Sequence, residues 1–395
     1  MKLNELMHKL IEVEPSGFPF LSIYLNAEPN EQGRDGYRIW LKTELSEQAK
    51  NYAEDSAEGQ SFNADVERIT KFLENEVEPA ANGIAIYASF GADEFFETMQ
   101  IEVTFPNNRL FVFDRPHIFP LARAIDQNPK YAVLWADTNK ADIYIFGGEN
   151  HINAEIETSA KVEEIQNEVT QGTKVGGWSQ ARYQRHIANF HLQHAKETVD
   201  ELDKLVRDAK IEHIILCGDE RVIMPTLRPQ LPKELEDKVV GTLNLSQYDS
   251  EDKIHEATLE IMHSQNAVGD KTAVERVFGA AKAAAGLGTL GVEDTLAALS
   301  NGQVEELLIS SNFDAIEYSP KKVKKVLRDY APGDDNSASD ELPKVREPRQ
   351  IADELIIRAL NSAAKIKFIE DETLLKEAHG VGAVLRYNIN ATANS

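Results

Sequence analysis

Cysteine is almost absent from this chain of 395 residues, which contains only Cys217. A single cysteine excludes an intramolecular disulfide and a zinc site built on cysteines, and it is typical of a reducing compartment. Apolar runs of about 18 residues, which a membrane-spanning helix needs, are also missing. The first residues have neither the apolar core nor the cleavage site of a signal peptide. We therefore expect a cytoplasmic protein without a membrane anchor.

Positive charge is scarce as well, because 42 Lys and Arg face 66 Asp and Glu and the net charge is −24. Such an excess disfavours indiscriminate binding to nucleic acid or membranes, but it leaves room for a local basic site. Residues 169–196 reverse the balance, since they contain no Asp or Glu. Phosphate backbones repel carboxylates and attract Lys and Arg. This segment is therefore the best candidate for an RNA contact.

Hydrophobic spacing indicates an α/β fold of three domains, each a mixed sheet packed with helices. The predicted domains span residues 1–124, 125–266 and 267–395, with a flexible insertion at 330–349 that is rich in Pro, Asp and Ser. The first domain has expected strands at 20–25, 83–87 and 99–103 and helices at 3–11, 37–50 and 65–76. The second has expected strands at 131–136, 141–146 and 211–218 and a long helix at 180–209. The third has expected helices at 274–285, 292–300 and 351–363 and strands at 305–309 and 365–369, and residues 287–291 are expected to end the first of these helices.

The long helix is predicted to be amphipathic. Its expected apolar stripe consists of Tyr183, Ile187, Phe190, Val199, Leu202 and Val206. The opposite face would carry Arg182, His186, Asn189, Gln193 and Lys196 at helical spacing. An ordinary solvated face has the same spacing, but the lack of interleaved acids favours contact with phosphates.

Gly176 and Gly177 precede this helix and fit either a flexible turn or a close approach of the backbone to RNA. Trp178 fits either a core anchor or a platform on which an RNA base stacks. His191 and His194 have no nearby carboxylate and no fourth ligand in the sequence, so we expect no metal and no cofactor.

Two other basic clusters stand out. Arg38 and Lys42 follow a turn-rich loop, and they fit either an exposed helix or an RNA contact. Residues 321–328 contain Lys321, Lys322, Lys324, Lys325 and Arg328. Most such runs are solvated helix faces, and the alternative is a contact to ribosomal RNA or to an acidic partner.

Residues 176–185, Gly-Gly-Trp-Ser-Gln-Ala-Arg-Tyr-Gln-Arg, resemble the middle-domain loop of archaeo-eukaryotic peptide release factors, Gly-Gly-Gln-Ser-Ala-x-Arg-Phe-x-Arg. Residues 380–387 resemble the closing segment of the third domain in the same superfamily. The resemblance covers residues 125–390 and, more weakly, the first domain. It is strongest to the bacterial branch that includes the ribosome-hibernation factor Balon, and more distant to Pelota.

The resemblance implies a ribosome-binding factor, expected to be a monomer, that occupies the vacant A site. Its first domain would lie at the small-subunit decoding centre and its loop at the large-subunit peptidyl-transferase centre. Its third domain would face a translational GTPase, for which elongation factor Tu is the natural bacterial candidate. The residues then expected to contact ribosomal RNA are Lys174, Gly176, Gly177, Trp178, Ser179, Gln180, Arg182, Arg185, His186 and Lys196, together with Arg38 and Lys42.

One departure from the family pattern bears on mechanism. The catalytic glutamine of the family is replaced by Trp178, whose indole offers one donor and no acceptor. The stop-codon-reading motifs of the family, Asn-Ile-Lys-Ser and Tyr-x-Cys, are absent from residues 1–125. We therefore expect no enzyme activity and a role in ribosome hibernation by occlusion. Two alternatives remain open: peptidyl-tRNA hydrolysis with Gln180 placing the water, and Pelota-like rescue of stalled ribosomes.

Overall fold

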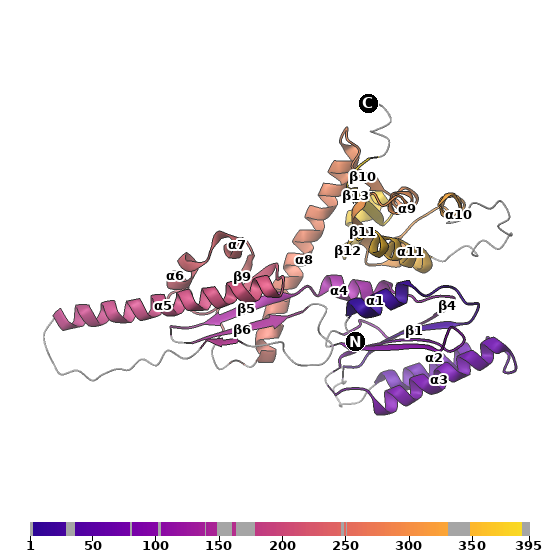
Figure 1. Cartoon of the computed structure of the whole chain (residues 1–395), viewed down its shortest axis with the longest axis horizontal. Helices are drawn as coiled ribbons and strands as arrows, with labels where there is room; N and C mark the ends of the chain where they lie inside the picture. The colour runs from indigo at the N-terminus through magenta and orange to yellow at the C-terminus, as the bar shows by residue number, and fades with distance from the viewer. Residues whose placement is uncertain are drawn as a thin grey trace. The chain divides into compact units, whose positions relative to one another are not determined.

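The computed structural model describes residues 3–28, 36–79, 81–101, 104–138, 140–147, 160–162, 178–245, 249, 251–330 and 348–388. At residues 3–4, 160–162, 178–187 and 251–252 the description is limited to the backbone. Helices and strands are interspersed along these ranges, and three sheets form in succession along the chain (Figure 1). The predicted α/β class is thus confirmed. No helix in the described ranges is long and apolar enough to span a membrane.

Contacts divide the chain into two compact units. Unit 1 consists mainly of Met1–Asn128 and Asn266–Ser395, and unit 2 mainly of Pro129–Gly148 and Glu155–Gln265. The first and last segments share unit 1 because their apolar side chains fill one core. That core contains Leu6, Ile118 and Phe119 from the first segment and Leu355 and Phe368 from the last. The boundaries predicted at residues 124 and 266 stay a prediction. The first and third segments each have an apolar cluster of their own, and the shared core joins them.

The first sheet of unit 1 has the order β3-β2-β1-β4. All its pairings are antiparallel, so the mixed sheet predicted for this segment is wrong. Both faces of its central strands are buried: Leu21 and Ile23 pack against α2 and α3, while Phe20 and Tyr24 face the shared core. The elements are α1 (Leu3–Ile11), β1 (Phe20–Asn26), α2 (Gly36–Ala49), α3 (Ala57–Asn75), β2 (Gly83–Ser89), β3 (Phe95–Ile101) and β4 (Arg109–Phe113).

The other sheet of unit 1 has the order β10-β13-β11-β12 and is mixed, as predicted, because only β11 and β12 run parallel. Residues 287–291 do more than end a helix, since β10 (Gly288–Leu290) pairs with β13. The predicted helix at 274–285 is the end of a longer one, α8 (Glu251–Lys282). The remaining elements are α9 (Val292–Ser300), β11 (Val304–Ser310), η2 (Phe313–Ala315), α10 (Pro320–Asp329), α11 (Pro348–Asn361), β12 (Lys365–Ile369), η3 (Glu372–Ala378) and β13 (Val381–Leu385).

A short helix that the sequence did not suggest, α4 (Phe119–Gln127), joins the two sheets of unit 1. The Arg123 guanidinium donates two hydrogen bonds to the Glu370 carboxylate, at 2.9 and 2.7 Å. The Asp126 carboxylate accepts a hydrogen bond from the backbone N–H of Phe368 at 2.8 Å. These bonds tie α4 to β12 and to the residue after it.

Unit 2 contains one mixed sheet in the order β7-β6-β5-β8-β9, with β5, β8 and β9 parallel. Ala132 and Leu134 of β5 pack against α5, whereas Val133 and Trp135 pack against Ile254 in α8. Side chains of a strand alternate between faces, so helices on both sides explain the unbroken apolar run of β5. The elements are β5 (Tyr131–Ala136), β6 (Ala141–Phe146), β7 (Ala160–Val162), α5 (Trp178–Asp208), β8 (His213–Cys217), α6 (Met224–Leu227), η1 (Arg228–Gln230), α7 (Lys233–Glu236) and β9 (Val239–Leu243).

Candidate nucleic-acid interface

The long helix predicted from the acid-free segment is α5, which begins at Trp178 and ends at Asp208. In Figure 1 its N-terminal part extends beyond the strands of its own sheet. Lys174, Gly176 and Gly177 lie outside the described residues. Trp178, Ser179, Gln180, Arg182, Arg185 and His186 lie in the first turns of the helix, and their side chains are outside what the structure describes.

From residue 188 onward the two faces of α5 can be distinguished. Asn189, Gln193 and Lys196 are exposed, as the predicted polar face requires. The buried face carries His194, Ala195, Thr198, Val199, Leu202 and Val206. Lys196 is therefore available to a partner, and it is the one predicted site residue of this helix whose exposure the structure describes.

Phe190 was predicted to belong to the apolar stripe, and this prediction is wrong. Its side chain is 39% exposed, whereas Val199 and Leu202 are 3% and 0% exposed. The reason is its position along the helix: among the described side chains of α5, burial begins at His194, so Phe190 precedes the part of the helix that packs on the sheet. Hydrophobic spacing gives the face of a helix but not how far along it the core extends.

Acidic residues return directly after the acid-free segment. The Gln193 amide donates to the Glu197 carboxylate at 2.8 Å, and Arg207 pairs with Asp203 one turn away. The C-terminal half of α5 is thus a helix with internally paired charges, while its N-terminal half carries no carboxylate. A polyanion would meet least repulsion at the N-terminal half.

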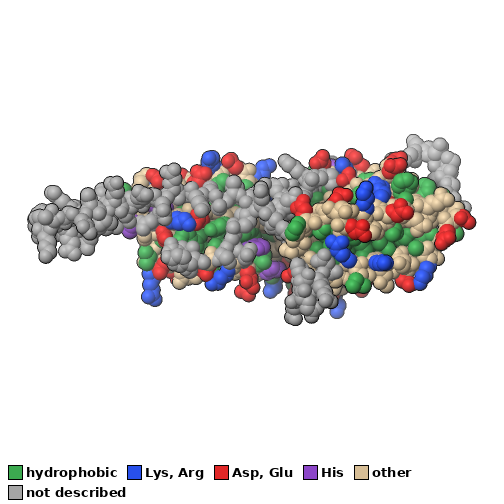
Figure 2. Space-filling model, turned by 90° about the horizontal axis from the view of Figure 1, so that it is seen from below, with side chains coloured by type: hydrophobic (Ala, Val, Ile, Leu, Met, Phe, Trp, Pro, Cys, Tyr) green, Lys and Arg blue, Asp and Glu red, His purple; other side chains and the backbone are tan. Residues whose placement is uncertain are grey.

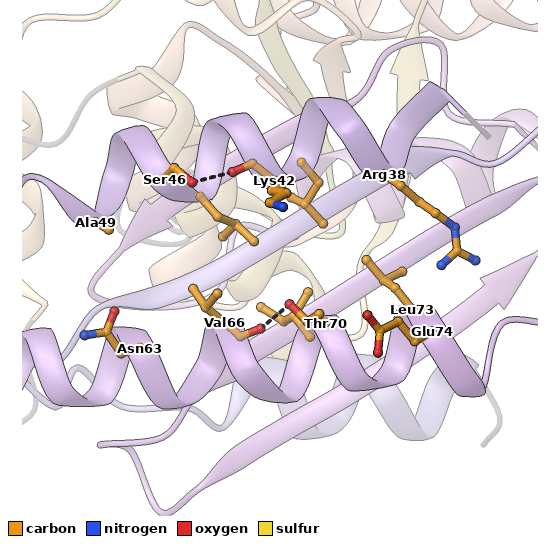
Figure 3. Close-up of a pocket in the computed structure, with 12 residues that line it drawn as sticks. Arg38, Lys42, Ser46, Ala49, Asn63, Val66, Thr70, Leu73 and Glu74 are labelled. Atoms are coloured by element: carbon orange, nitrogen blue, oxygen red, sulfur yellow. Dashed lines mark hydrogen bonds between the residues drawn. The ribbon is translucent and has the colours of Figure 1, made fainter. Parts of the chain in front are cut away.

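Arg38 and Lys42 lie on α2 and line a groove between α2 and α3 (Figure 3). The groove has a volume of about 480 Å³ and a floor of leucine and isoleucine side chains, among them Leu41 and Ile69. Lys42 is exposed, and the Arg38 guanidinium lies 5.5 Å from the centre of the Tyr37 ring. On the face in Figure 2, acidic and basic side chains are interspersed. Arg38 and Lys42 therefore line one groove, and Glu74 lines it with them.

Comparison with known families gives two matches, one over the residues of unit 2 and one over the C-terminal segment of unit 1. Residues 116–263 match the model of bacterial archaeo-eukaryotic release factor family 10. Residues 267–389 match the model of domain 3 of the eukaryotic release factor, eRF1. The two matches together place the chain in the archaeo-eukaryotic release factor superfamily. The first match contains the whole of α5, and the second contains α10 and the closing segment at 380–387.

Similar sequences are release factors of archaea and eukaryotes. Peptide chain release factor subunit 1 of Thermococcus kodakarensis is 24% identical over 355 residues, which cover 82% of this chain and 83% of that protein. The Pyrococcus abyssi protein of the same name is 22% identical and covers 98% of each chain. Eukaryotic peptide chain release factor subunit 1 of Saccharomyces cerevisiae is 27% identical over 197 residues, or 46% of this chain and 45% of that protein.

Solved structures that are similar include Pelota of Archaeoglobus fulgidus and Dom34 of Saccharomyces cerevisiae. Pelota is 14% identical with a TM-score of 0.32, covering 80% of this chain and 82% of its own. Dom34 is 12% identical with a TM-score of 0.34, covering 81% of this chain and 93% of its own. Because these scores are low, we base the superfamily assignment on the sequence matches.

Among the described residues of this release-factor relative, no group of three or more His, Cys, Asp or Glu side chains could hold a metal ion. His194 is 1% exposed, and neither of its ring nitrogens has a hydrogen-bond partner in the described part of the chain. Burial raises the pKa of the Cys217 thiol to about 12, so this thiol is protonated and unreactive at neutral pH. Cys217 is therefore a core side chain and no nucleophile.

The C-terminal segment of this release-factor relative carries a basic surface that we had not included among the expected contacts. The five cations of residues 321–328 all lie on α10, and all five side chains are exposed. The sequence signal was the charge run itself. The sequence alone did not show whether acidic side chains from other segments would neutralise this charge.

Proposed function

We propose that this chain is a ribosome-binding translation factor that occupies the vacant A site and protects idle ribosomes. The observation that carries the proposal is Trp178 at the family's glutamine position, inside a segment that matches a bacterial release factor family. A factor that keeps the family's fold but lacks the family's hydrolytic side chain is suited to occupying the site without cleaving peptidyl-tRNA.

The chemistry of the indole supports occlusion. An amide side chain can donate and accept hydrogen bonds at once and so can orient a water molecule, whereas an indole only donates. An indole can instead stack on an unpaired base, which contributes about 1–3 kcal/mol. Trp178 begins α5, so its backbone is placed at the end of the helix that reaches past the sheet.

The charge of α5 supports contact with RNA at the same end. The acid-free segment ends at Lys196, which is exposed, and carboxylates resume at Glu197. In a chain with a net charge of −24, this arrangement confines phosphate binding to the N-terminal half of the helix. We propose that Arg182, Arg185 and Lys196 contact large-subunit RNA near the peptidyl-transferase centre. In the same proposal Arg38 and Lys42 face the decoding centre.

The partner of the C-terminal segment is proposed to be a translational GTPase, with elongation factor Tu as the bacterial candidate. Support comes from the match of residues 267–389 to domain 3 of the eukaryotic release factor. Co-precipitation of elongation factor Tu with the full chain from ribosome-bound fractions tests this partnership.

Peptide release separates occlusion from hydrolysis. We expect the wild-type protein to release no peptide from ribosomes that carry peptidyl-tRNA in the P site, and we expect Trp178→Ala to weaken ribosome occupancy. Gln180→Ala should change neither property. Release by the wild type that disappears in Gln180→Ala would replace our proposal with a peptidyl-tRNA hydrolase. Splitting of stalled ribosomes without peptide release would replace it with a Pelota-like rescue factor.

A salt series tests the proposed RNA contact of α5. Arg182→Gln, Arg185→Gln and Lys196→Gln together should weaken co-sedimentation with ribosomes and lower its salt dependence, because each lost phosphate contact removes about one counterion-release step. The control changes Lys204 and Arg207, which lie farther along α5 and pair with Glu201 and Asp203. Equal co-sedimentation of the triple variant and the wild type at every salt concentration would refute the contact.

A further inference from the structure

The surface of α10 (Pro320–Asp329) is the most strongly basic feature that the structure describes. Four lysines and one arginine lie within this ten-residue helix, and every one of them is exposed. A helix of this length is about 15 Å long, since it rises about 1.5 Å per residue. We call these five residues, Lys321, Lys322, Lys324, Lys325 and Arg328, the α10 cation face.

The helix is anchored by its opposite side. Val323 is 3% exposed and belongs to the core of unit 1, and Val326 and Leu327 are partly buried against the same core. At about 100° per residue, these three side chains occupy one arc of the helix, and the five cations together with the exposed Asp329 occupy the remaining arc. The α10 cation face is thus held toward solvent by a fixed apolar contact.

Three other cations of unit 1 are neutralised by carboxylates. Arg123 pairs with Glu370 at 2.7 Å, Lys367 pairs with Asp270 at 3.0 Å, and Arg276 pairs with Glu306. By contrast, no member of the α10 cation face forms an ion pair with, or donates a side-chain hydrogen bond to, any residue of the described ranges. In a chain in which acids outnumber cations, this concentration of cations without a carboxylate partner among the described residues favours a partner with negative charge.

We propose that the α10 cation face binds the phosphate backbone of double-helical ribosomal RNA. Protein interfaces are depleted of lysine and centre on aromatic and other apolar side chains, whereas the apolar side of α10 is already used by the core. Lysine is a compact point charge that suits phosphate. The inference rests on the proposed function only in identifying the RNA as ribosomal. Binding of phosphates by the α10 cation face does not depend on the A site or on Trp178.

A binding measurement with isolated RNA tests whether the α10 cation face binds a phosphate backbone. The full chain with Lys321→Gln, Lys325→Gln and Arg328→Gln is titrated against a fluorescein-labelled RNA duplex between about 50 and 200 mM salt. A control carries Lys71→Gln, Lys233→Gln and Lys376→Gln, which remove the same charge from exposed lysines scattered over the chain. All six side chains are exposed, so neither change should disturb folding, and circular dichroism spectra of both variants check this.

We expect the α10 variant to bind the duplex about tenfold or more weakly than the control at the lowest salt, with a smaller slope of log affinity against log salt. Equal affinity and slope in the two variants would overturn the inference. Labelled polyglutamate is the second probe: if the wild type binds it and the α10 variant does not, while duplex binding is unchanged, the face takes an acidic protein instead.

The source of the RNA is tested on ribosomes. Cys217 is fully buried, so Lys325→Cys introduces one reactive thiol to which an iron chelate can be attached for hydroxyl-radical cleavage. We expect cleavage of ribosomal RNA from this position in co-sedimented complexes. Co-sedimentation without any cleavage would refute ribosomal RNA as the ligand. Failure to co-sediment would count against the proposed function, and the duplex titration would still decide whether the α10 cation face binds RNA.

Discussion

The carboxylate of Asp353 lies 2.6 Å from Nδ1 of His117, although 236 residues separate the two in the chain. Both side chains are buried. The other Asp353 oxygen accepts hydrogen bonds from the backbone N–H groups of Ile118 and Phe119, at 2.9 and 3.0 Å. Ile118 precedes α4 and has no side-chain oxygen with which to cap it. A residue of α11 therefore caps α4 from the far end of the chain.

Further polar groups surround this contact. The Ser22 hydroxyl accepts a hydrogen bond from the backbone N–H of His117 at 3.0 Å, and the Tyr24 hydroxyl donates to the His117 carbonyl. The hydroxyls of Tyr24 and Tyr87 lie 2.7 Å apart. Burial raises the pKa of Tyr24 and that of Tyr87 well above the usual value, so both hydroxyls remain neutral. The network joins β1, β2, α4 and α11.

Asp353→Ala should lower the stability of unit 1 by about 3–5 kcal/mol, because it leaves His117 and two buried N–H groups without an acceptor. Urea unfolding measures the loss, and hydrogen exchange at the amides of Ile118 and Phe119 shows where it acts. Asp314→Ala, at an exposed carboxylate of unit 1, is the control. A loss no greater than that of the control would mean that the cap is not important for stability.

Gly380→Ala should destabilise unit 1 more than Gly302→Ala does. Both glycines have positive φ, +79° and +66°, which costs an alanine about 1–2 kcal/mol. An added Cβ at Gly380 would also lie 2.6 Å from the carbonyl oxygen of Ala315, whereas nothing lies within 4 Å of one at Gly302. Urea midpoints of the two variants isolate the backbone clash. Equal midpoints would show that the backbone at Gly380 can shift to accommodate the added methyl group.

Asp65 should make stability fall as pH rises. Burial raises the pKa of its carboxyl to about 7, although the N–H of Phe90 donates to it at 2.9 Å. The folded state therefore holds this proton more tightly than the unfolded state, where the pKa is about 3.9. The stabilisation is fully present below about pH 4 and is lost as pH rises through about 7.

Asp65→Asn should flatten this dependence, because the amide oxygen can still accept from Phe90 and the side chain no longer titrates. Urea unfolding at about pH 5 and pH 7 should show the variant gaining on the wild type at the higher pH. Some slope should persist, since burial also raises the pKa of Asp126 to about 6. Asp55→Asn, at an exposed carboxylate, is the control. Parallel profiles for Asp65→Asn and the wild type would contradict the expectation.

Three strands of unit 2, β5, β6 and β8, could be predicted from the sequence because they are short, mainly apolar runs bounded by turns, whereas β7 and β9 were not predicted. The sequence did not suggest α4, because its cap comes from Asp353 and no local residue signals its start. The first half of α8 was not predicted either. Its N-terminal half packs in the core of unit 2 and its C-terminal half in unit 1, so no single apolar stripe runs along the helix.

For the candidate site, the sequence predicted α5 to within two residues at its start, together with the exposure of Lys196. It did not predict that Phe190 lies beyond the core, because spacing alone carries no information on the size of the sheet. It also could not show that the cations of α10 form no ion pair with the described residues, since such partners come from distant segments.

The shared core of unit 1 affects how the chain is made. The ribosome finishes Asn128 before it begins the more than two hundred residues that lead to Asp353. At about 5–20 residues per second, the apolar surface around Ile118 and Phe119 waits roughly ten to forty-five seconds for its partner helix. Unit 2 is complete during that interval. The newly made N-terminal segment therefore exposes part of its apolar surface throughout this interval, and slowing synthesis should increase its aggregation before the chain is complete.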